Sequence, residues 1–468
     1  MGRKNFIIED LAIIDIGAEG KAIAKHNDKV VFLPMLVPGD VVDANVVKNK
    51  SSFMEAIPVA FKQYSKDRVP SFCEYFGSCG GCKWQHLDYS KQLYYKEKQV
   101  FDQLERIGKL TIKKRLPILA SEKTQYYRNK LEFTFSNRRW LSTEELSMIE
   151  DVSMAGPALG FHVAGLFDKV LDIHQCYLQS ELSNDIRNFL RDYALKNEIS
   201  FFDIRNHVGI LRNLVIRTSS IGEIMVIVSF YTTELDVINP IMQALSVNFP
   251  SVTSWMYAMN MKGNDSLSGV DIHLFSGRDF IYEELDHLKF RIAPQSFFQT
   301  NSNQTLVMYR KVLEFAKLSG NEVVYDLYTG TGTIANFLAP HAAKVVGIEY
   351  VPEAIEDAEK NSEINNLSNT VFYAGDMKDV LNADFIITNG TPDVLVTDPP
   401  RAGMHADVVK AILEAKPKRI VYVSCNPATQ ARDIALLAHE YSVEIVQPLD
   451  MFPHTHHVEN IVLLERMV

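Results

Sequence analysis

The sequence lacks the long apolar run of a membrane-spanning helix, and among its 468 residues only five are cysteine and three are tryptophan. No stretch approaches the roughly 18 to 20 consecutive apolar residues that such a helix needs. Residues 1–5 are not followed by the apolar core of a signal peptide. The hydrophobic content of 47% and the charged content of 23% are typical of a soluble globular protein, so we expect a cytoplasmic location and no membrane partner.

Net positive charge is also missing, because the formal net charge is −10. This excludes a protein that coats nucleic acid nonspecifically, but residues 61–140 hold 17 Lys and Arg against 8 Asp and Glu. A local basic face favours a polyanionic partner, and the alternative is an ordinary solvated helix face. The candidate members of that face are Lys91, Lys96, Lys98, Arg106 and Lys109.

The chain is long enough for two or three domains, and its pattern predicts three. Residues 1–60 alternate short β-rich runs with turn residues such as Gly17 and Gly20, which is typical of a small OB-like β-barrel. Residues 61–295 begin with a cysteine-rich segment and a helical stretch, and then carry several strand-like runs. We expect a central α+β domain there.

Residues 296–468 alternate buried strand-like runs with helical stretches, a pattern that predicts a Rossmann-like doubly wound α/β domain. Ligands of such sheets bind beyond the carboxyl ends of the strands. Four polar residues end predicted strands and are therefore expected to face one crevice. They are Asp326, Glu349, Asp398 and Cys425.

A glycine-rich turn follows the first of these strands. Tyr328, Gly330, Gly332 and Thr333 lie in it, and missing Cβ atoms let a ligand approach the backbone. Glu349 follows Gly330 by 19 residues, which is the separation at which an acid can bind both ribose hydroxyls. The turn alone does not separate a nicotinamide cofactor from S-adenosylmethionine.

The sequence Asp398-Pro399-Pro400-Arg401 favours the second cofactor. A carboxylate followed by two prolines makes a stiff ledge that can hold a planar base, and such ledges recur in methyltransferases. The alternative is a structural turn with a capping aspartate.

Two further residues near this ledge are candidates for the chemistry. Cys425 ends a buried strand and precedes Asn426-Pro427, so we predict that it is a nucleophile whose pKa is lowered by electropositive surroundings. The alternative is a buried small residue. Glu459 follows three histidines whose spacing matches no tetrahedral metal site, and it is the best candidate for a general base.

The remaining four cysteines predict a metal site. Cys73, Cys79 and Cys82 are close in sequence, and Cys176 is the only plausible fourth ligand. In a reducing compartment such a group binds metal more often than it forms disulfides. Spacing alone does not separate zinc from an iron-sulfur cluster.

Together these stretches resemble the RNA uracil-C5 methyltransferases, in particular the branch with an N-terminal TRAM barrel and a [4Fe-4S] cluster that modifies 23S ribosomal RNA. The resemblance covers essentially the whole chain and includes 127–130, 209–217 and 297–301. It implies that Cys73, Cys79, Cys82 and Cys176 ligate the cluster, that Cys425 is the nucleophile and that Glu459 accepts the proton. The resemblance further implies that Asp398 both contributes to the cofactor-binding site and takes part in catalysis. The other predicted cofactor-binding residues are Gln299, Tyr328, Gly330, Gly332, Thr333, Glu349 and Asp376.

One departure from the family concerns Thr333, because relatives often carry Asn there. The resemblance implies methylation of C5 of a specific uridine in 23S ribosomal RNA by a protein that we expect to be monomeric. A transfer-RNA uracil-C5 methyltransferase is the nearest alternative, and a noncatalytic RNA-binding or ribosome assembly factor is an alternative of another class. A nicotinamide oxidoreductase is a more distant one.

Overall fold

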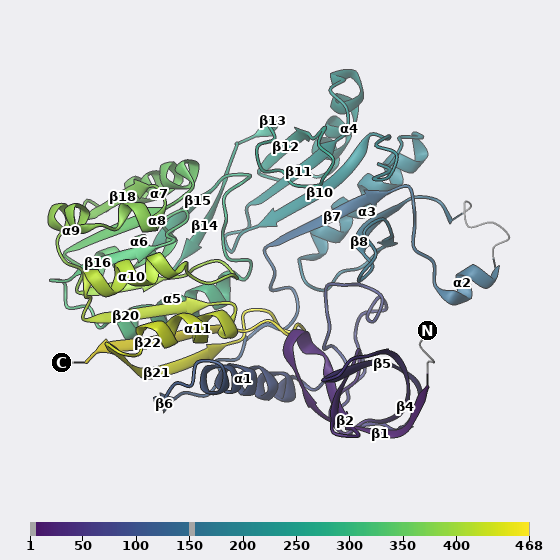
Figure 1. Ribbon diagram of the computed structural model, residues 1–468. Helices are drawn as coiled ribbons and strands as arrows, with labels where there is room; N and C mark the ends of the chain where they lie inside the picture. Colours follow the sequence, from purple (N-terminus) through teal and green to yellow (C-terminus); the bar gives the residue numbers. More distant parts are fainter. Residues whose placement is uncertain (1–5, 149–154, 468) are drawn as a thin grey trace.

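Alternating apolar residues close the N-terminal segment into a five-stranded barrel. The computed structural model describes residues 6–148 and 155–467, and the barrel lies at one end of the molecule (Figure 1). Ile8, Leu11, Val31 and Leu33 are among the side chains that fill its core. The strands are β1 (Ile7–Ile16), β2 (Ala22–His26), β3 (Lys29–Leu33), β4 (Val41–Asn49) and β5 (Phe53–Gln63), with a 3₁₀ turn at Ala18–Gly20.

A seven-stranded sheet forms the central region, in the order β13-β12-β11-β10-β7-β8-β9. One face packs against α3 (Glu181–Lys196) and α4 (Leu235–Asn248). The other face joins the core of the C-terminal region, so the two regions share a hydrophobic interface. The remaining elements are β7 (Lys130–Ser136), α2 (Thr143–Met148), β8 (Ala158–His162), β9 (Val170–Asp172), β10 (Leu211–Thr218), β11 (Ile224–Phe230), β12 (Ser254–Met259) and β13 (Ile272–Gly277).

The C-terminal region is built on an eight-stranded sheet in the order β18-β17-β16-β19-β20-β22-β21-β6, and its first five strands are parallel. The strand order reverses between β16 and β19, which is where doubly wound sheets bind ligands. The strands are β16 (Val323–Leu327), β17 (Lys344–Glu349), β18 (Thr370–Ala374), β19 (Val394–Thr397), β20 (Arg419–Ser424), β21 (Tyr441–Leu449) and β22 (Glu459–Arg466).

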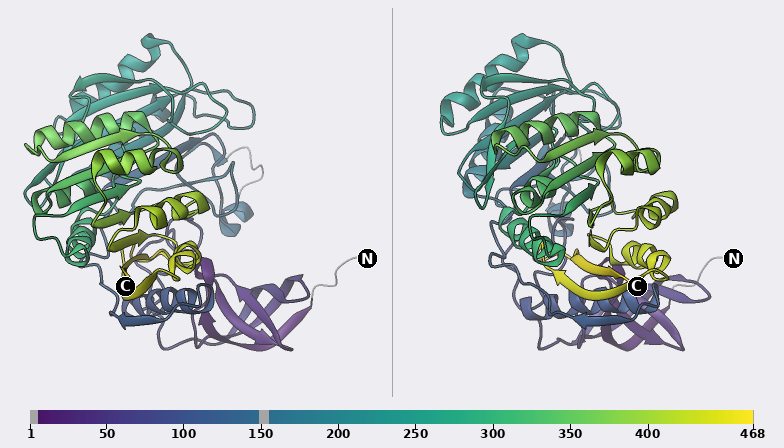
Figure 2. Two further views of the ribbon diagram at one scale, coloured as in Figure 1. Left: turned by 60° about the vertical axis from the view of Figure 1, so that its left-hand side comes forward. Right: turned by 90° about the vertical axis from the view of Figure 1, so that its left-hand side faces the viewer.

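Helices cover both faces of this sheet (Figure 2). Side chains of α5 and α6 pack on one face, and those of α10 and α11 pack on the other. The predicted Rossmann-like domain is therefore present. The helices are α5 (Ser302–Ala316), α6 (Thr333–Leu338), α7 (Pro352–Ile364), α8 (Met377–Val380), α9 (Ala383–Asn389), α10 (Ala406–Ala415) and α11 (Pro427–Leu437), with a 3₁₀ turn at Ala339–His341.

Two elements that precede the central sheet in sequence belong to the C-terminal sheet in space, which differs from the expected boundary at residue 295. Strand β6 (Ile112–Arg115) pairs in parallel with β21, and α1 (Tyr89–Arg106) packs under the same sheet face as α11. Sequence reasoning missed this because β6 reads Ile-Lys-Lys-Arg and has no apolar pattern, and its partner strand lies over 300 residues later.

Both interpretations of the basic residues of α1, a face for a polyanionic partner and a solvated helix face, require exposed side chains, and Lys96 fits neither. Its side chain is fully buried, whereas Lys91 and Arg106 remain partly exposed. Gln92, Lys96 and Val100 are all buried, and their spacing of four residues places them on one side of the helix.

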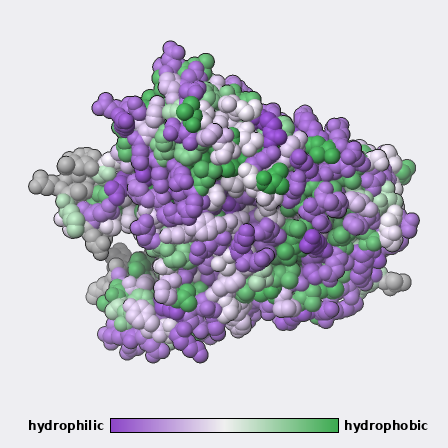
Figure 3. Space-filling model, turned by 180° about the vertical axis from the view of Figure 1, so that it is seen from behind, coloured by the Kyte–Doolittle hydropathy of each residue, from purple (hydrophilic) through white to green (hydrophobic). Residues whose placement is uncertain are grey.

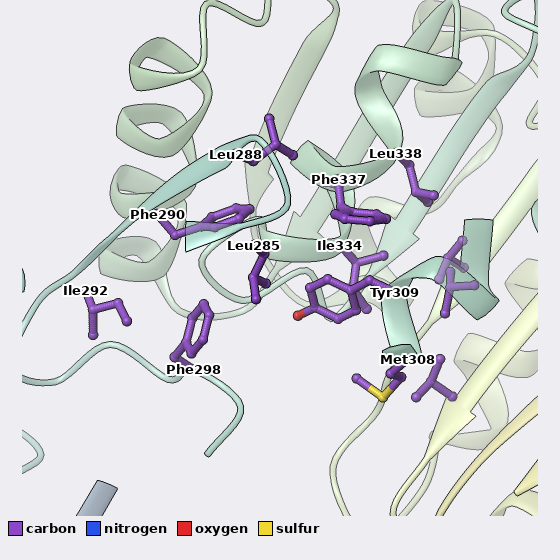
Figure 4. Packing of buried hydrophobic residues seen from close by; sticks show 14 of the residues in the cluster. Leu285, Leu288, Phe290, Ile292, Phe298, Met308, Tyr309, Ile334, Phe337 and Leu338 are labelled. Atoms are coloured by element: carbon purple, nitrogen blue, oxygen red, sulfur yellow. The ribbon is translucent and has the colours of Figure 1, made fainter. Parts of the chain in front are cut away.

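A hairpin of β14 (Ile281–Leu285) and β15 (Leu288–Ile292) precedes the C-terminal sheet and packs against it. Figure 4 shows Phe290 and Phe298 facing Tyr309 of α5 and Phe337 of α6 in one apolar cluster. Phe298 is buried, but its neighbour Phe297 is 68% exposed. The core therefore anchors the segment 297–301 at Phe298 and leaves the preceding residue, Phe297, exposed.

The rear surface mixes hydrophilic and hydrophobic residues, and a notch separates the barrel from the central region above it (Figure 3). Of the helices in the described part of the chain, none combines the length and the apolar character that crossing a bilayer requires.

Candidate active site and cysteine cavity

The glycine-rich turn after β16 has a backbone that few side chains would allow. Tyr328, Gly330 and Gly332 have φ angles of 61°, 56° and 72°. A Cβ on Gly332 would lie 2.8 Å from Cβ of Ala358, so a side chain would push α6 away from α7. Apart from its chain neighbours, no heavy atom of the described residues lies within 4 Å of the Cβ position at Gly330, which leaves the turn open to a ligand.

Two acids support this turn. Glu349 accepts hydrogen bonds from the backbone N–H of Gly330 at 3.1 Å and of Val351 at 3.0 Å. Asp326 accepts one from Thr329 Oγ1 at 2.5 Å, while its buried Oδ1 has no partner among the described residues. Burial, with smaller contributions from Asp398 and Glu349, raises the pKa of Asp326 to about 7. An unpaired buried carboxyl oxygen favours a ligand that donates or carries positive charge.

The structure brings Asp398, Cys425 and Glu459 together at the carboxyl ends of β19 and β20 and the adjacent start of β22. Burial raises the pKa of Asp398 to about 7. Burial also raises the pKa of Glu459 well above its usual value, helped by the charge of Asp398. Both acids are thus biased toward the protonated form in the absence of ligands.

The expectation of a lowered pKa at Cys425 is wrong. Burial raises the pKa of this thiol to about 11, and the charges of Glu459 and Asp398 raise it further. The positive charge of Arg401 opposes them and lowers the pKa of the thiol. Apart from this arginine, the charged groups around the thiol are acidic, because Asp398 and Glu459 at the strand ends face the same space. The resting side chain is therefore a thiol.

Three other residues are predicted to bind the cofactor, and each has a protein partner in this structure. Gln299 is held by Asn129, whose Nδ2 donates to the Gln299 carbonyl at 2.9 Å. Thr333 Oγ1 shares a hydrogen bond of 2.7 Å with the Tyr309 hydroxyl, so this threonine side chain already has a protein partner. Asp376 caps α8 and pairs with Lys378 at 3.1 Å, and its charge adds to the effect of burial in raising the pKa of Tyr328.

A buried ion pair fixes the segment that leads into Glu459, and sequence reasoning missed it. Lys96 Nζ lies 2.6 Å from Asp450 Oδ1 and donates to the Phe452 carbonyl at 3.0 Å. The Tyr89 hydroxyl donates to the other oxygen of Asp450 at 2.9 Å. The four-residue spacing of Lys96 from buried Val100 was the one available signal in the sequence.

The four remaining cysteines line one cavity of about 570 Å³, together with residues of the C-terminal region such as Phe297 and Arg401. Burial raises the pKa of Cys79 to about 11 and that of Cys82 to about 12, and each thiol feels the charge of the others. Within residues 6–148 and 155–467, no group of three or more His, Cys, Asp or Glu side chains is arranged to hold a metal ion. The described side chains therefore show no preformed metal site, whether for zinc or for the predicted iron-sulfur cluster.

The crevice fits S-adenosylmethionine. The open turn at Gly330 admits the ligand to the backbone, and Glu349 stands at the expected ribose position. Among the described residues neither Asp326 nor Asp398 forms an ion pair, so a positively charged sulfonium ligand would stabilise the ionised forms of both buried carboxyls.

Known proteins share this architecture. A family model described as tRNA (Uracil-5-)-methyltransferase matches residues 269–467. An uncharacterized RNA methyltransferase of Bacteroides thetaiotaomicron is 56% identical over 453 residues, covering 96% of this chain and 100% of that protein. Another from Chlorobaculum tepidum is 40% identical over 473 residues, covering 99% and 97%.

A solved structure extends the likeness to three dimensions. The Pyrococcus abyssi tRNA (uracil-54, C5)-methyltransferase in complex with S-adenosyl-L-homocysteine is 30% identical, has a TM-score of 0.76, and is matched over 97% of this chain and 99% of its own. All of these matches are RNA methyltransferases, so they argue against the alternatives of a nicotinamide oxidoreductase and a noncatalytic factor. The chain belongs to the RNA uracil-5-methyltransferase family and is an S-adenosylmethionine-dependent enzyme.

Proposed function

We propose that this enzyme methylates C5 of a specific uridine in 23S ribosomal RNA through a covalent bond between Cys425 and C6 of the uracil. The convergence of Cys425, Asp398 and Glu459 beside the glycine-rich turn carries the proposal. It supplies a nucleophile, a hydrogen-bond donor and a proton acceptor around one space, which are the groups that activation of an unreactive uracil C5 requires.

In this mechanism the thiolate of Cys425 adds to C6, and the electron pair of the C5–C6 bond moves toward C5 and O4. Asp398, protonated because of its raised pKa, stabilises the enolate by donating to it. C5 then takes the methyl group that S-adenosylmethionine supplies, and the methyl–sulfur bond breaks. Glu459 removes the C5 proton, the C5–C6 double bond re-forms, and Cys425 leaves as thiolate.

Cys425 loses its proton to solvent as substrate binds in this scheme, because its pKa lies far above neutrality in the free protein and Glu459 must remain ionised to accept the C5 proton. Arg401 is the side chain that lowers the pKa of Cys425, and it also lowers that of Glu459. It therefore favours the ionised forms of both reacting groups at the moment each must carry charge.

We further propose that Cys73, Cys79, Cys82 and Cys176 hold a [4Fe-4S] cluster. The supporting observations are their shared cavity and the mutual effect on their pKa values. A cubane cluster is larger than one ion, so its ligands stand further apart than those of a zinc site. The cluster would shape the RNA-binding surface, since no step of methyl transfer needs electrons.

A transfer-RNA target is the second candidate. The likeness to the Pyrococcus abyssi tRNA (uracil-54, C5)-methyltransferase favours it, because that likeness spans the barrel as well as the catalytic region. The cysteine pattern, as part of the family resemblance, favours ribosomal RNA instead, whereas the barrel is shared with the tRNA enzyme and does not separate the two.

Methyl transfer from labelled S-adenosylmethionine to total RNA from a strain lacking this gene separates the two targets. We expect label as 5-methyluridine in 23S RNA after size separation and nucleoside analysis. Label in transfer RNA would select the second candidate. No label in any RNA, including precursor ribosomal particles, would overturn the proposed function.

A further inference from the structure

A second cavity, of about 370 Å³, lies where the barrel, the cysteine segment and the C-terminal region meet. The barrel contributes Glu19, the cysteine segment contributes Lys83, and the C-terminal region contributes Arg401, His456 and His457. No predicted site residue lines it. Arg401 and His457 also line the larger cysteine cavity, so the two spaces adjoin beside the nucleophile.

The walls of this junction cavity are fixed to one another. The backbone N–H groups of Lys83 and Trp84 both donate to the His454 carbonyl, at 2.9 and 3.0 Å. The Trp84 indole N–H donates to the Gly20 carbonyl at 3.4 Å. Gly20 has a φ of 73°, and a Cβ there would lie 2.9 Å from Cβ of His456. The three regions therefore hold the cavity open in a defined shape.

The residues that line the cavity carry an excess of positive charge, because Lys83 and Arg401 outnumber Glu19. Within the described residues, neither Lys83 nor Arg401 has a carboxylate oxygen within 4.0 Å. Lys83 Nζ makes one hydrogen bond, of 3.4 Å, to the backbone carbonyl of Glu19. The Glu19 carboxylate is already paired with Lys21 at 3.0 Å. Two cations face this space against one carboxylate that is already paired with Lys21, and this excess of positive charge favours a negatively charged ligand.

The histidines add hydrogen-bond donors without negative charge. Burial lowers the pKa of His456 to about 4 and that of His457 to about 3, so both rings are neutral near pH 7. A neutral imidazole retains one N–H donor. Nδ1 of His456 is buried and has no partner in the part of the chain that the structure describes.

We propose that the junction cavity binds a backbone phosphate of the RNA strand next to the target uridine, with Lys83 and Arg401 as its cationic ligands. The proposal rests on RNA being the substrate. Arg401 directly follows Asp398-Pro399-Pro400 at the candidate active site and also lines this cavity, so a phosphate held here lies beside the space for the target base. Phosphate contacts fix the register of a bound strand, and that is the role of this cavity.

Equilibrium binding of RNA by the full-length protein, followed by fluorescence anisotropy at several salt concentrations, tests this site without requiring catalysis. Lys83→Ala and Lys83→Gln should weaken binding about fivefold to tenfold and lower the slope of log Kd against log salt by about 1. Lys83→Arg should retain both. Lys196→Ala, at the exposed end of α3, is the matched control and should change neither.

Neutral methylphosphonate linkages on either side of the accepting uridine then locate the phosphate. One of them should weaken binding to the wild-type protein about as much as Lys83→Ala does, and should have no further effect on that variant. Unchanged affinity and salt slope in Lys83→Ala would overturn the inference. A wild-type protein that binds RNA but transfers no methyl group would overturn the proposed function and leave this site standing.

Discussion

The cofactor crevice and the cysteine cavity both bury ionisable groups, but they are built differently. In the crevice Asp326, Asp398 and Glu459 sit at the ends of neighbouring strands, and burial raises the pKa of each. In the cavity Cys79 and Cys82 come from a segment without helix or strand and meet Cys176 from the central region. Strand pairing in the sheet fixes the positions of the crevice acids. The positions of the cavity cysteines depend largely on side-chain packing and on any bound group.

This difference indicates which of the two sites needs a bound ligand for its structural stability. Strand pairing keeps the crevice acids in place whether or not a cofactor is bound. The four cysteine side chains, of which Cys176 is buried and the other three are half-buried, gain little stability from one another, so a bound cluster would supply much of the stability of this site. Substitutions in the crevice should therefore affect catalysis, and substitutions in the cavity should affect folding.

The largest expected effect is on turnover. Cys425→Ala should lower kcat by at least about 10⁴-fold, because it removes the atom that forms the covalent bond. Affinity for S-adenosylmethionine should stay within about twofold, measured by calorimetry, since the thiol is not part of the glycine-rich turn. Near-normal turnover in this variant would exclude Cys425 as the nucleophile.

The buried ion pair between Lys96 of α1 and Asp450, in the segment before Glu459, should give the second largest effect, which is on the free energy of unfolding. Lys96→Ala leaves Asp450 buried without its cation and should cost about 3 to 5 kcal/mol of unfolding free energy in urea. The double variant Lys96→Met with Asp450→Leu should lose less. Lys98→Ala is the control on the same helix, because its ion pairs are partly exposed, and should cost less than about 1 kcal/mol.

Cys176→Ala should remove bound iron and lower Tm by several degrees, while Cys425→Ala retains the iron. RNA affinity should fall, and affinity for S-adenosylmethionine should not. Metal analysis and thermal unfolding measure both changes. Wild-type protein that carries zinc, or a Cys176→Ala variant with full iron content, would contradict the cluster assignment.

The smallest effect is a pH dependence in the crevice. The pKa values of Asp326 and Asp398 are about 7, so both carboxyls are mostly protonated at pH 6 and ionised at pH 8. The ionised form attracts the sulfonium of S-adenosylmethionine, and S-adenosylhomocysteine lacks that charge. Preference for the methyl donor over the product should therefore rise roughly threefold to tenfold from pH 6 to 8 by calorimetry. Asp326→Asn should flatten this dependence.

The sequence by itself determined the Rossmann-like region, the glycine-rich turn and the strand-end positions of Asp398 and Cys425. These features come from local patterns: apolar strand runs, positive-φ glycines and polar residues directly after strands. The N-terminal barrel was predictable for the same reason.

Only the tertiary structure decided the placement of α1 and β6, the burial of Lys96 and the raised pKa of Cys425. Each depends on groups far apart in the chain: β6 pairs with β21, Lys96 meets Asp450, and Cys425 faces Glu459. Burial and charge act through space, so a pKa or an ion pair is set by neighbours that a local pattern does not reveal. The junction cavity has the same origin, because Lys83 and Arg401 meet only when three regions of the chain are assembled.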